Sequence, residues 1–392
     1  MKILIANVGS TSFKYKLYDD GQVVASGRLE RIGDDVSPQQ YVTGDDVHET
    51  DTGLPDYETA VRGVLDRLTA SGVLTSIDAL DAVGFKTVHI KGEAGTLELT
   101  EDVLERMAAY NELAPAHNPP YIQAIRIFRD LEKGLKLIGL FEAAFHTTIP
   151  DYAYIYGVPY RWYEKHGVRK YGFHGASHRY VSERIPQLLG KSTDGLRIVS
   201  CHLGGSSSLC AIRDGSSLDT SMGFSPQDGV INATRNGSID PFIVPYVMDH
   251  EDLSTDEVRR ILNSESGLLG ISGISGDMRD LLEASESGNE RARLAVEAYA
   301  YSVRREIGAM TAAIGGIDAL AFTGGIGERS ADVRALVCEG LDYLGIAIDP
   351  SANVSGDPER EISSAGSDTR TFVVTTDEEA IVARAVTKFL DT

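Results

Sequence analysis

The 392-residue sequence has few cysteines, and their arrangement argues against two kinds of site. Only Cys201, Cys210 and Cys338 occur, an odd number without a Cys-x-x-Cys pair. A disulfide framework needs paired cysteines in an oxidising compartment, and a zinc ribbon needs closely spaced pairs. The sequence therefore predicts neither, and a reducing cytoplasm is the location that we expect.

Long apolar runs are also missing from the chain. No stretch approaches the roughly 20 consecutive apolar residues that a membrane-spanning helix needs. The first ten residues, MKILIANVGS, contain too short an apolar run for a signal peptide and no small-residue cleavage pattern. We therefore expect no membrane partner.

Positive charge is scarce, since 37 Lys and Arg residues face 58 Asp and Glu residues and give a net charge of -21. This balance disfavours nucleic acids and anionic membranes as partners. It does not exclude small anionic substrates, because a local site can be basic inside an acidic protein. The length exceeds what one ordinary hydrophobic core supports and predicts two domains.

One strand pattern occurs twice along the chain. It consists of an apolar strand, a loop of small residues, a second strand, an Asp-Gly turn and a third strand. The first copy spans residues 2–7, 7–12, 13–18, 20–21 and 22–29. The second copy spans residues 196–202, 204–208, 209–213, 214–215 and 216–219. Chance similarity of two hairpins is one explanation, and a duplicated chain with two related α/β halves is the other.

Helical periodicity and turn signals outline the rest of the chain. Apolar spacing predicts helices over residues 57–71, 101–113, 120–131, 177–189, 255–263 and 290–314. A third unit has a strand at 319–322, a glycine loop at 323–328 and a helix from Asp332. A late strand at 371–375 leads into a final helix, and the polar stretch 351–370 reads as a surface excursion.

Three small-residue turns follow apolar strands, at residues 9–12, 204–208 and 324–327. Backbone N–H groups in such turns suit phosphate oxygens, although a single Gly-Ser turn is usually structural. No GxxxxGK[ST] motif is present, so a P-loop ATPase is disfavoured. The three turns together favour a phosphate-binding function.

Several charged residues stand in positions that could carry chemistry. Residues 170–180, KYGFHGASHRY, place two histidines and two cations before a helix, which packing explains poorly. Arg235 lies among turn residues and could clamp a phosphoryl group or cap the turn. Glu142 ends an apolar run and could pair with a cation or act in a site. Lys86 lies in an apolar stretch and could be an edge charge or a carboxylate anchor.

These segments together resemble the acetokinase family of acetate and propionate kinases. The matching blocks are NVGSTSFKYKLY, ELAPAHNPP, FEAAFHTTIPDYAY, RKYGFHGASHRYV, SCHLGGSSS, DTSMGF, ATRNGSIDP, SGISGDMRDL, FTGGIGERS and TTDEEAIVAR. The resemblance implies a duplicated ribonuclease-H-like α/β fold of the actin, Hsp70 and sugar kinase type, with two domains around a central cleft. The first domain would cover residues 1–146, joined by a C-terminal helix at 380–392, and the second would cover 147–379 with most nucleotide contacts.

The resemblance also implies a role for each matching residue. It assigns Mg²⁺, with Mn²⁺ as an alternative, to Asn7 and Glu378, and catalysis to Glu142, His174 and Arg235. It assigns the carboxylate substrate to Lys86, Val88, His117, Phe173 and Pro226. It assigns the nucleotide to Ser10, Ser12, Lys14, His202, Leu203, Gly204, Gly205, Ser206, Asp277, Met278, Arg279, Gly325, Ile326, Gly327, Glu328 and Arg329.

The activity that the resemblance implies is reversible transfer of the γ-phosphoryl group of ATP to acetate, giving acetyl phosphate and ADP, by a cytoplasmic homodimer. Phosphoryl transfer needs positioning and charge neutralisation more than covalent help from the protein. The attacking carboxylate is already ionised near neutral pH and needs no general base.

The sequence departs from the family pattern at four places. The family has arginine at Lys86, aspartate at Glu142, asparagine in the second phosphate turn where this chain reads GGSSS, and leucine at Ala116. Lysine keeps the charge of arginine but loses its planar fork. A kinase for propionate or butyrate, a non-catalytic nucleotide-binding homologue and a pyrophosphate-dependent enzyme are the alternatives. Binding alone would not require the whole phosphoryl-transfer set, so the retained Asn7, His174, Arg235 and Glu378 argue against the second alternative. The intact FTGGIGERS block argues against the third.

Overall fold

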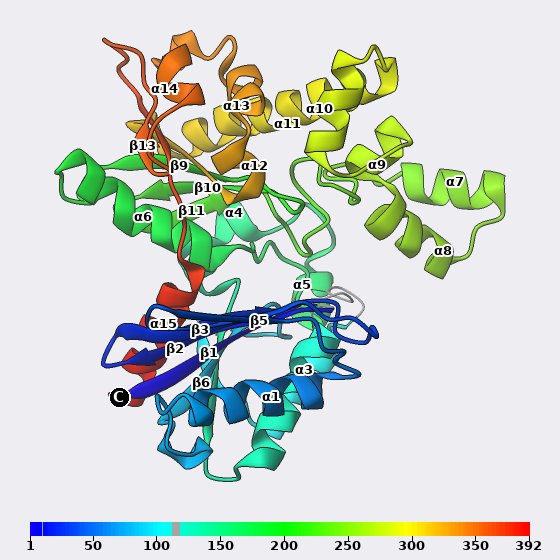
Figure 1. The fold of residues 1–392 in the computed structure, drawn as a ribbon. Coiled ribbons are helices and arrows are strands. Elements are labelled where there is room, and N and C mark those ends of the chain that lie inside the picture. The colour runs from blue at the N-terminus through cyan, green and yellow to red at the C-terminus, as the bar shows by residue number, and fades with distance from the viewer. Residues whose placement is uncertain (10, 112–117) are drawn as a thin grey trace. The chain divides into compact units, whose positions relative to one another are not determined.

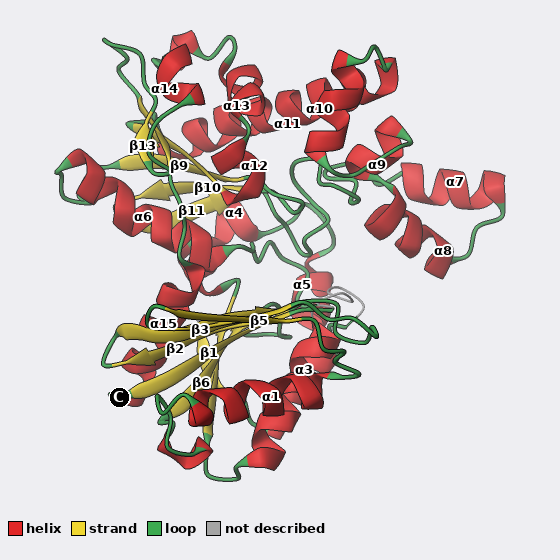
Figure 2. Cartoon of the chain, in the orientation of Figure 1, coloured by secondary structure: helices red, strands yellow, loops and turns green. Residues whose placement is uncertain are grey.

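The computed structural model describes residues 1–9, 11–111 and 118–392, which form two compact units. Unit 1 consists of Met1–Ala144 and Asp377–Thr392, and unit 2 is Phe145–Thr376. Each unit is built on one β-sheet covered by helices (Figures 1 and 2). Among the helices of the described residues, none has the length and apolar character that crossing a bilayer demands.

Unit 1 contains an eight-stranded sheet with the order β5-β4-β3-β2-β1-β6-β8-β7. Its strands are β1 (Lys2–Val8), β2 (Phe13–Asp19), β3 (Gln22–Leu29), β4 (Gln39–Thr43), β5 (Asp46–Thr50), β6 (Ala82–Thr87), β7 (Thr96–Glu98) and β8 (Lys136–Phe141). Its helices are α1 (Tyr57–Ala70), α2 (Glu101–Ala108), α3 (Asn118–Leu131) and α15 (Glu378–Leu390). The central strand β1 is a continuous apolar run because both of its faces are covered.

Helices cover both faces of this sheet, as two adjacent residues of β6 demonstrate. A Cβ atom on Gly84 would come within 2.8 Å of Val386 in α15, so that helix packs directly on the strand. The ring of Phe85 meets the ring of Phe128 in α3 edge to face, with centroids 5.7 Å apart. Successive strand residues point to opposite faces, so α15 and α3 lie on opposite sides of the sheet.

Unit 2 contains a six-stranded sheet with the order β11-β10-β9-β12-β14-β13. Its strands are β9 (Arg197–His202), β10 (Ser208–Arg213), β11 (Ser216–Thr220), β12 (Ala319–Thr323), β13 (Arg360–Glu361) and β14 (Arg370–Val373). Its helices are α4 (Asp151–Tyr154), α5 (Tyr160–His166), α6 (Gly175–Leu189), α7 (Ile243–Glu251), α8 (Thr255–Arg260), α9 (Gly267–Ser272), α10 (Met278–Glu286), α11 (Glu290–Ile314), α12 (Gly324–Arg329), α13 (Ala331–Cys338) and α14 (Pro350–Val354).

The two sheets share one topology, which confirms the duplicated ribonuclease-H-like α/β fold. In unit 1, β1 pairs antiparallel with β2 and parallel with β6, and β8 joins β6 in parallel. In unit 2, β9 pairs antiparallel with β10 and parallel with β12, and β14 joins β12 in parallel. Both Asp-Gly turns have positive φ at both residues, as a two-residue hairpin turn requires.

Alternating residues of the unit 2 strands build two separate cores. Ile198, Ala319 and Ala321 pack with Val181 and Ile185 of α6. Their neighbours Val199, Cys201, Leu320 and Phe322 pack with the long helix α11. The sheet is therefore covered by α6 on one face and by α11 on the other.

Three local predictions need correction. Residues 323–328, predicted to be a glycine loop, are the last residue of β12 and most of the helix α12. The helix forms because a carbonyl from a distant segment, that of Leu203, accepts hydrogen bonds from the amides of Ile326 and Gly327 at 2.8 and 3.1 Å. The predicted helix 255–263 ends its α-helical part at Arg260 and continues as a π-helical turn. The stretch 351–370 is not only a surface excursion, since it holds most of α14, β13 and the buried Ile362.

Candidate functional site

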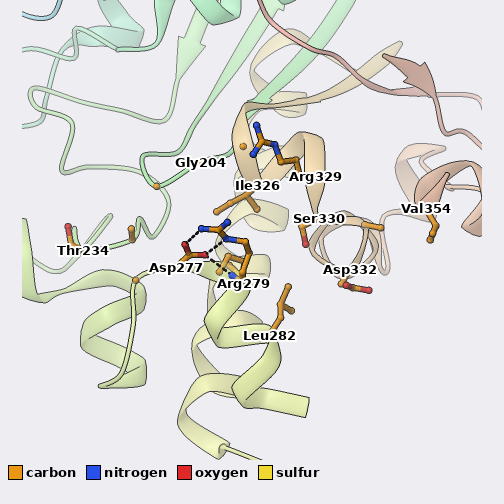
Figure 3. A pocket seen from close by; sticks show the side chains of 16 residues that line it. Gly204, Thr234, Asp277, Arg279, Leu282, Ile326, Arg329, Ser330, Asp332 and Val354 are labelled. Carbon is orange, nitrogen blue, oxygen red and sulfur yellow. Dashed lines mark hydrogen bonds and ion pairs between the residues drawn. The ribbon is translucent and has the colours of Figure 1, made fainter. Parts of the chain in front are cut away.

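Unit 2 contains a pocket of about 870 Å³ whose wall comes from five separate segments of the chain (Figure 3). Eight residues predicted to bind nucleotide line it: Gly204, Gly205, Asp277, Met278, Arg279, Gly325, Ile326 and Arg329. Further lining residues that the sequence analysis did not select are Thr234, Leu282, Ser330, Asp332 and Val354. The volume lies within the range typical of small-molecule sites.

The turn after β9 and the start of α12 form one wall of the pocket. Gly324 has φ +75°, and a Cβ atom there would lie 2.7 Å from the Leu203 carbonyl oxygen, so only glycine fits. Leu203 is fully buried and accepts hydrogen bonds from α12, so it joins the two segments and does not line the pocket. Glu328 accepts from the Gly324 amide at 3.1 Å, and burial raises the pKa of its carboxyl group.

Arg334 fixes the other end of α12, although nothing in the sequence distinguishes it. Its guanidinium is 1% exposed and donates to the carbonyls of Gly327 and Glu328 at 2.8 and 3.0 Å. It also donates to the side chain and carbonyl of Asn353 at 2.7 and 2.6 Å. Burial lowers the pKa of Arg334 to about 10, and these acceptors hold α12 and α14 together beside the pocket.

Asp277 and Arg279 form a charged edge of the pocket (Figure 3). Asp277 caps α10, and its carboxylate accepts from the Arg279 amide at 2.9 Å. It also accepts from the Arg279 guanidinium at 2.6 and 3.0 Å, and this bond is the main cause that lowers the pKa of Asp277 to about 2. The Arg279 side chain is 87% exposed, so it can meet a ligand without leaving a core.

Arg235 is a cation of unit 2 whose side chain lies beside the turn that lines the pocket. It is half-buried, and its guanidinium donates to the Ser206 hydroxyl, which is next to the pocket residue Gly205. Burial lowers the pKa of Arg235 to about 10, so the group stays protonated at neutral pH. Within the part of the chain that the structure describes, no carboxylate forms an ion pair with it. A cation of this kind is poised to bind an anionic ligand.

His174 occupies a strained position at the start of α6. It is the N-cap residue and has φ +57°, a conformation uncommon for a residue other than glycine. Its Nδ1 lies 2.8 Å from the Ser208 hydroxyl, and its ring stacks on His202 with centroids 4.2 Å apart. His202 in turn contacts the Ser177 hydroxyl through Nδ1 at 2.8 Å.

The two predicted apolar substrate residues of unit 2 are both buried. Phe173 is 2% exposed, and its carbonyl lies 3.0 Å from Nε2 of the buried His146. Pro226 lies in the loop after β11, where the Phe224 amide donates to the Tyr156 hydroxyl at 2.9 Å. Neither is among the residues lining the 870 Å³ pocket.

Three predicted residues of unit 1 form a buried ion cluster. Lys86 Nζ lies 3.0 Å from Glu142 Oε1, and it also donates to Glu378 at the start of α15. The three side chains are 18%, 5% and 16% exposed. Burial opposes the charge on Lys86, but the two carboxylates more than offset it and hold its pKa well above the usual value. Lys86 therefore stays cationic.

Asn7 lies close to the same helix start. Its side-chain amide donates to Glu379 Oε1 at 3.1 Å, and the Tyr121 hydroxyl donates to Asn7 Oδ1 at 3.3 Å. Beside it, Lys16 pairs with Asp377 at 2.8 Å. The sequence analysis selected only Asn7 from this group.

The other predicted unit 1 residues are placed as follows. Lys14 is exposed and pairs across the sheet with Asn7, while Val88 is buried just after β6. Ser12 is half-buried, and its carbonyl accepts from the Gly9 amide at 2.8 Å. Ser10, Ala116 and His117 lie outside the described residues.

The oxygen and nitrogen donors of the described residues determine which metal ion the protein could bind. Among the described residues, no group of three or more His, Cys, Asp or Glu side chains could hold a metal by itself. Mg²⁺ usually takes one or two protein oxygens and completes its shell with water and substrate phosphates. The amide oxygen of Asn7 and the carboxylate of Glu378 are oxygen donors of that kind, so the donor set fits Mg²⁺.

Comparison with known proteins gives consistent results. The model of the acetokinase family matches residues 2–384. The acetate kinase of Halothermothrix orenii is 44% identical over 400 aligned positions, which cover 100% of both chains. The crystal structure of Porphyromonas gingivalis acetate kinase is 37% identical, covers 99% of both chains and has a TM-score of 0.87. The crystal structure of a propionate kinase from Francisella tularensis is 34% identical, covers 98% of both chains and has a TM-score of 0.89.

Proposed function

This chain belongs to the acetokinase family, and on that premise we propose that it catalyses reversible, Mg²⁺-dependent transfer of the γ-phosphoryl group of ATP to acetate, giving acetyl phosphate and ADP. The observation that carries the proposal is Arg235. Its guanidinium is cationic, half-buried and not paired with any described carboxylate, and it lies next to a residue of the 870 Å³ pocket. Such a group supplies the charge that a transferring phosphoryl group requires.

The pocket of unit 2 is assigned to the nucleotide. Its apolar side chains, among them Ile326 and Leu282, suit a base, and Arg279 and Arg329 provide positive charge for phosphates or ribose hydroxyls. The turn at Gly204 and Gly205 lets the backbone approach a phosphate closely, since it carries no side chain. ATP or ADP is therefore the co-substrate that we assign.

The transfer step is assigned to a few polar groups. Arg235 would neutralise equatorial phosphoryl oxygens, and His174 would donate a hydrogen bond to them through its ring nitrogen Nε2. Asn7 and Glu378 would hold Mg²⁺, with Mn²⁺ as a substitute, and the ion when bound neutralises phosphate charge. The acetate oxygen attacks as an ionised carboxylate, so Glu142 does not need to act as a base toward it.

Lys86 has a different setting from that of a simple substrate anchor. Two carboxylates already surround it, so a substrate carboxylate would be the third anion near one ammonium group. We propose that Lys86 primarily holds Glu142 and Glu378 in place.

Propionate is the second candidate substrate. The propionate kinase from Francisella tularensis is similar to this chain over 98% of its length, as are acetate kinases. Ala116, where the family has leucine, would leave more room for a longer acid. Acetate stays the first choice because relatives that are 44% and 42% identical over 100% and 98% of this chain carry the name acetate kinase.

We also propose that the protein works as a homodimer in the cytoplasm. Unit 2 exposes aromatic side chains on or directly before short helices, with Phe242 79%, Tyr246 62% and Tyr160 62% exposed. Exposed aromatic groups of this size are typical of protein interfaces. A second copy of the chain would cover them. Sedimentation at several concentrations tests this assignment.

The decisive experiment is an acyl-hydroxamate assay with ATP and Mg²⁺ over acetate, propionate and butyrate. We expect product with acetate or propionate and a loss of at least about 10³-fold in kcat for Arg235→Ala. Wild-type protein that binds ATP but forms no product with any short acid would refute the proposed activity. It would favour the non-catalytic homologue.

A further inference from the structure

A row of buried hydroxyl and imidazole groups leads from the interior of unit 2 to His174. His178 lies one helical turn after His174 on α6 and is fully buried. Its Nδ1 lies 2.9 Å from the Ser200 hydroxyl on β9, and its Nε2 lies 2.8 Å from the Ser208 hydroxyl on β10. The same Ser208 oxygen lies 2.8 Å from Nδ1 of His174. Four groups thus form one continuous hydrogen-bonded row.

The chemistry of these groups allows only two arrangements of protons. The Ser208 hydroxyl has one hydrogen, so it donates to one imidazole and accepts from the other. Burial, with lesser contributions from nearby histidines, lowers the pKa of His178 well below its usual value, so this ring is neutral. A neutral imidazole has one donor and one acceptor, and the hydroxyls of Ser200 and Ser208 can complement either tautomer.

Each arrangement has a defined consequence for His174. In the first, Ser208 donates to Nδ1 of His174, so the proton of the neutral ring stands on Nε2. In the second, Nδ1 of His174 donates to Ser208, which is the arrangement that a protonated His174 requires. The row therefore satisfies every buried polar group in both charge states of His174. Both arrangements engage Nδ1 with Ser208, so Nδ1 of His174 is not the nitrogen that a ligand would meet.

We propose that His178 is a positioning residue for phosphoryl transfer, which acts through Ser208 to hold the Nδ1 edge of His174 and to direct Nε2–H toward the transferring anion. The inference rests on the proposed function, since the role of His174 in transfer belongs to it. The positive φ of His174 agrees with this role, because a strained residue needs surrounding contacts to keep its conformation. The stacked ring of His202 limits rotation from its other side.

The test compares two substitutions at one buried position. Glutamine places its amide where Nε2 of His178 lies, so His178→Gln keeps the contact with Ser208. Asparagine places its amide where Nδ1 lies, so His178→Asn keeps the contact with Ser200 and loses the contact with Ser208. Ser208→Ala breaks the same link without changing His178 and serves if the His178 variants do not fold.

Ser217→Ala is the matched control. Ser217 is also fully buried on a strand of the same sheet, and its hydroxyl lies 2.9 Å from Nδ1 of another buried histidine, His146. That histidine contacts the carbonyl of Phe173 and has no hydrogen bond to Ser208 among the described residues. This variant therefore removes a hydrogen bond of the same kind that is not part of the row, at a histidine whose ring meets that of His178 edge to face with centroids 5.7 Å apart.

The readout is NMR of ¹⁵N-histidine-labelled full-length protein, with the His174 signals identified from a His174→Gln sample, together with kcat and KM. We expect His178→Asn and Ser208→Ala to shift the His174 ring nitrogens and to lower kcat about five- to tenfold, with KM changed less than about twofold. His178→Gln should lose less than about threefold, and Ser217→Ala should leave the His174 signals and kcat unchanged.

Unchanged His174 signals in both His178→Asn and Ser208→Ala would overturn the inference. Shifted signals with normal kcat would overturn the positioning role and leave the proposed activity intact. Failure of the proposed function has a different signature, since the wild-type protein would then form no acyl phosphate. In that case the NMR signals alone decide whether His178 holds His174.

Discussion

The buried cluster around Lys86 predicts a large and pH-dependent loss of stability when its cation is removed. Lys86→Met keeps the length of the side chain and deletes the charge, leaving Glu142 and Glu378 without the ammonium between them. The two carboxylate side chains are only 5% and 16% exposed, so water cannot screen them fully. Removing one partner of a buried ion pair costs about 3–5 kcal/mol. For a unit of this size, that loss corresponds to about 6–20 °C in Tm.

The sign of the pH dependence follows from the charges. In the variant, one of the two facing carboxyl groups should have a raised pKa, so the folded state takes up a proton more readily than the unfolded chain. The loss of unfolding free energy in the variant, relative to the wild type, should therefore be larger at pH 8 than at pH 5. In the wild type the pKa of Lys86 is raised well above its usual value, so Lys86 is charged at both pH 5 and pH 8. The stabilisation that its charge provides is therefore fully present at both pH values.

Urea unfolding at pH 5 and pH 8 measures both effects, and Lys16→Met is the matched control. Lys16 also pairs with the start of α15, but its side chain is 28% exposed and that of Asp377 is 37% exposed. An exposed pair of this kind is worth up to about 1 kcal/mol. Equal losses for the two lysine variants, or a loss below about 1 kcal/mol for Lys86→Met, would refute the argument from burial.

Four further predictions concern activity, the pocket and the ion cluster. Arg235→Lys should restore only part of the kcat that Arg235→Ala loses, because lysine lacks the planar fork, and full rescue in the hydroxamate assay would show that charge alone suffices. Glu378→Ala should weaken Mg²⁺ binding in a metal titration monitored by calorimetry with ATP present, and an unchanged Mg²⁺ affinity would remove Glu378 from the metal site. Gly324→Ala should weaken ADP binding at least tenfold in the same instrument, since its Cβ atom would lie 2.7 Å from a carbonyl oxygen, and normal affinity would show that α12 can shift. Lys86→Arg combined with Glu142→Asp should keep near-wild-type stability and favour acetate over longer acids, and an inactive double variant with two active single variants would argue against acetate as the substrate.

The features that could be predicted well from the sequence are those that short segments determine by themselves. The Asp-Gly turns at residues 20–21 and 214–215 marked both hairpins, and the apolar period predicted α11 with its observed bounds. The family fold followed from matching blocks. The helix α12 was missed because its glycines favour a loop locally, and the Leu203 carbonyl that binds it lies more than a hundred residues earlier.

Contacts between distant segments explain the remaining omissions. Lys86 and Glu378 are 292 positions apart, so no local pattern could reveal that a predicted substrate anchor and a predicted metal ligand contact each other. Arg334 resembled an ordinary helix arginine, yet it is fully enclosed by carbonyl groups. The link from His178 to His174 depends on Ser208, a residue that the sequence presented only as part of a small-residue turn.

The position of α15 in unit 1 has a consequence for synthesis of the protein on the ribosome. Unit 2 is one uninterrupted segment, whereas unit 1 needs its last helix to cover the face of β6 at Gly84 and to supply a carboxylate to Lys86. All strands of unit 1 are translated first, yet that unit can be completed only after residues 377–390 have left the exit tunnel. The whole of unit 2 is thus translated before unit 1 can be completed, and a nascent chain must keep the apolar face of its earlier sheet from aggregating until α15 has been made.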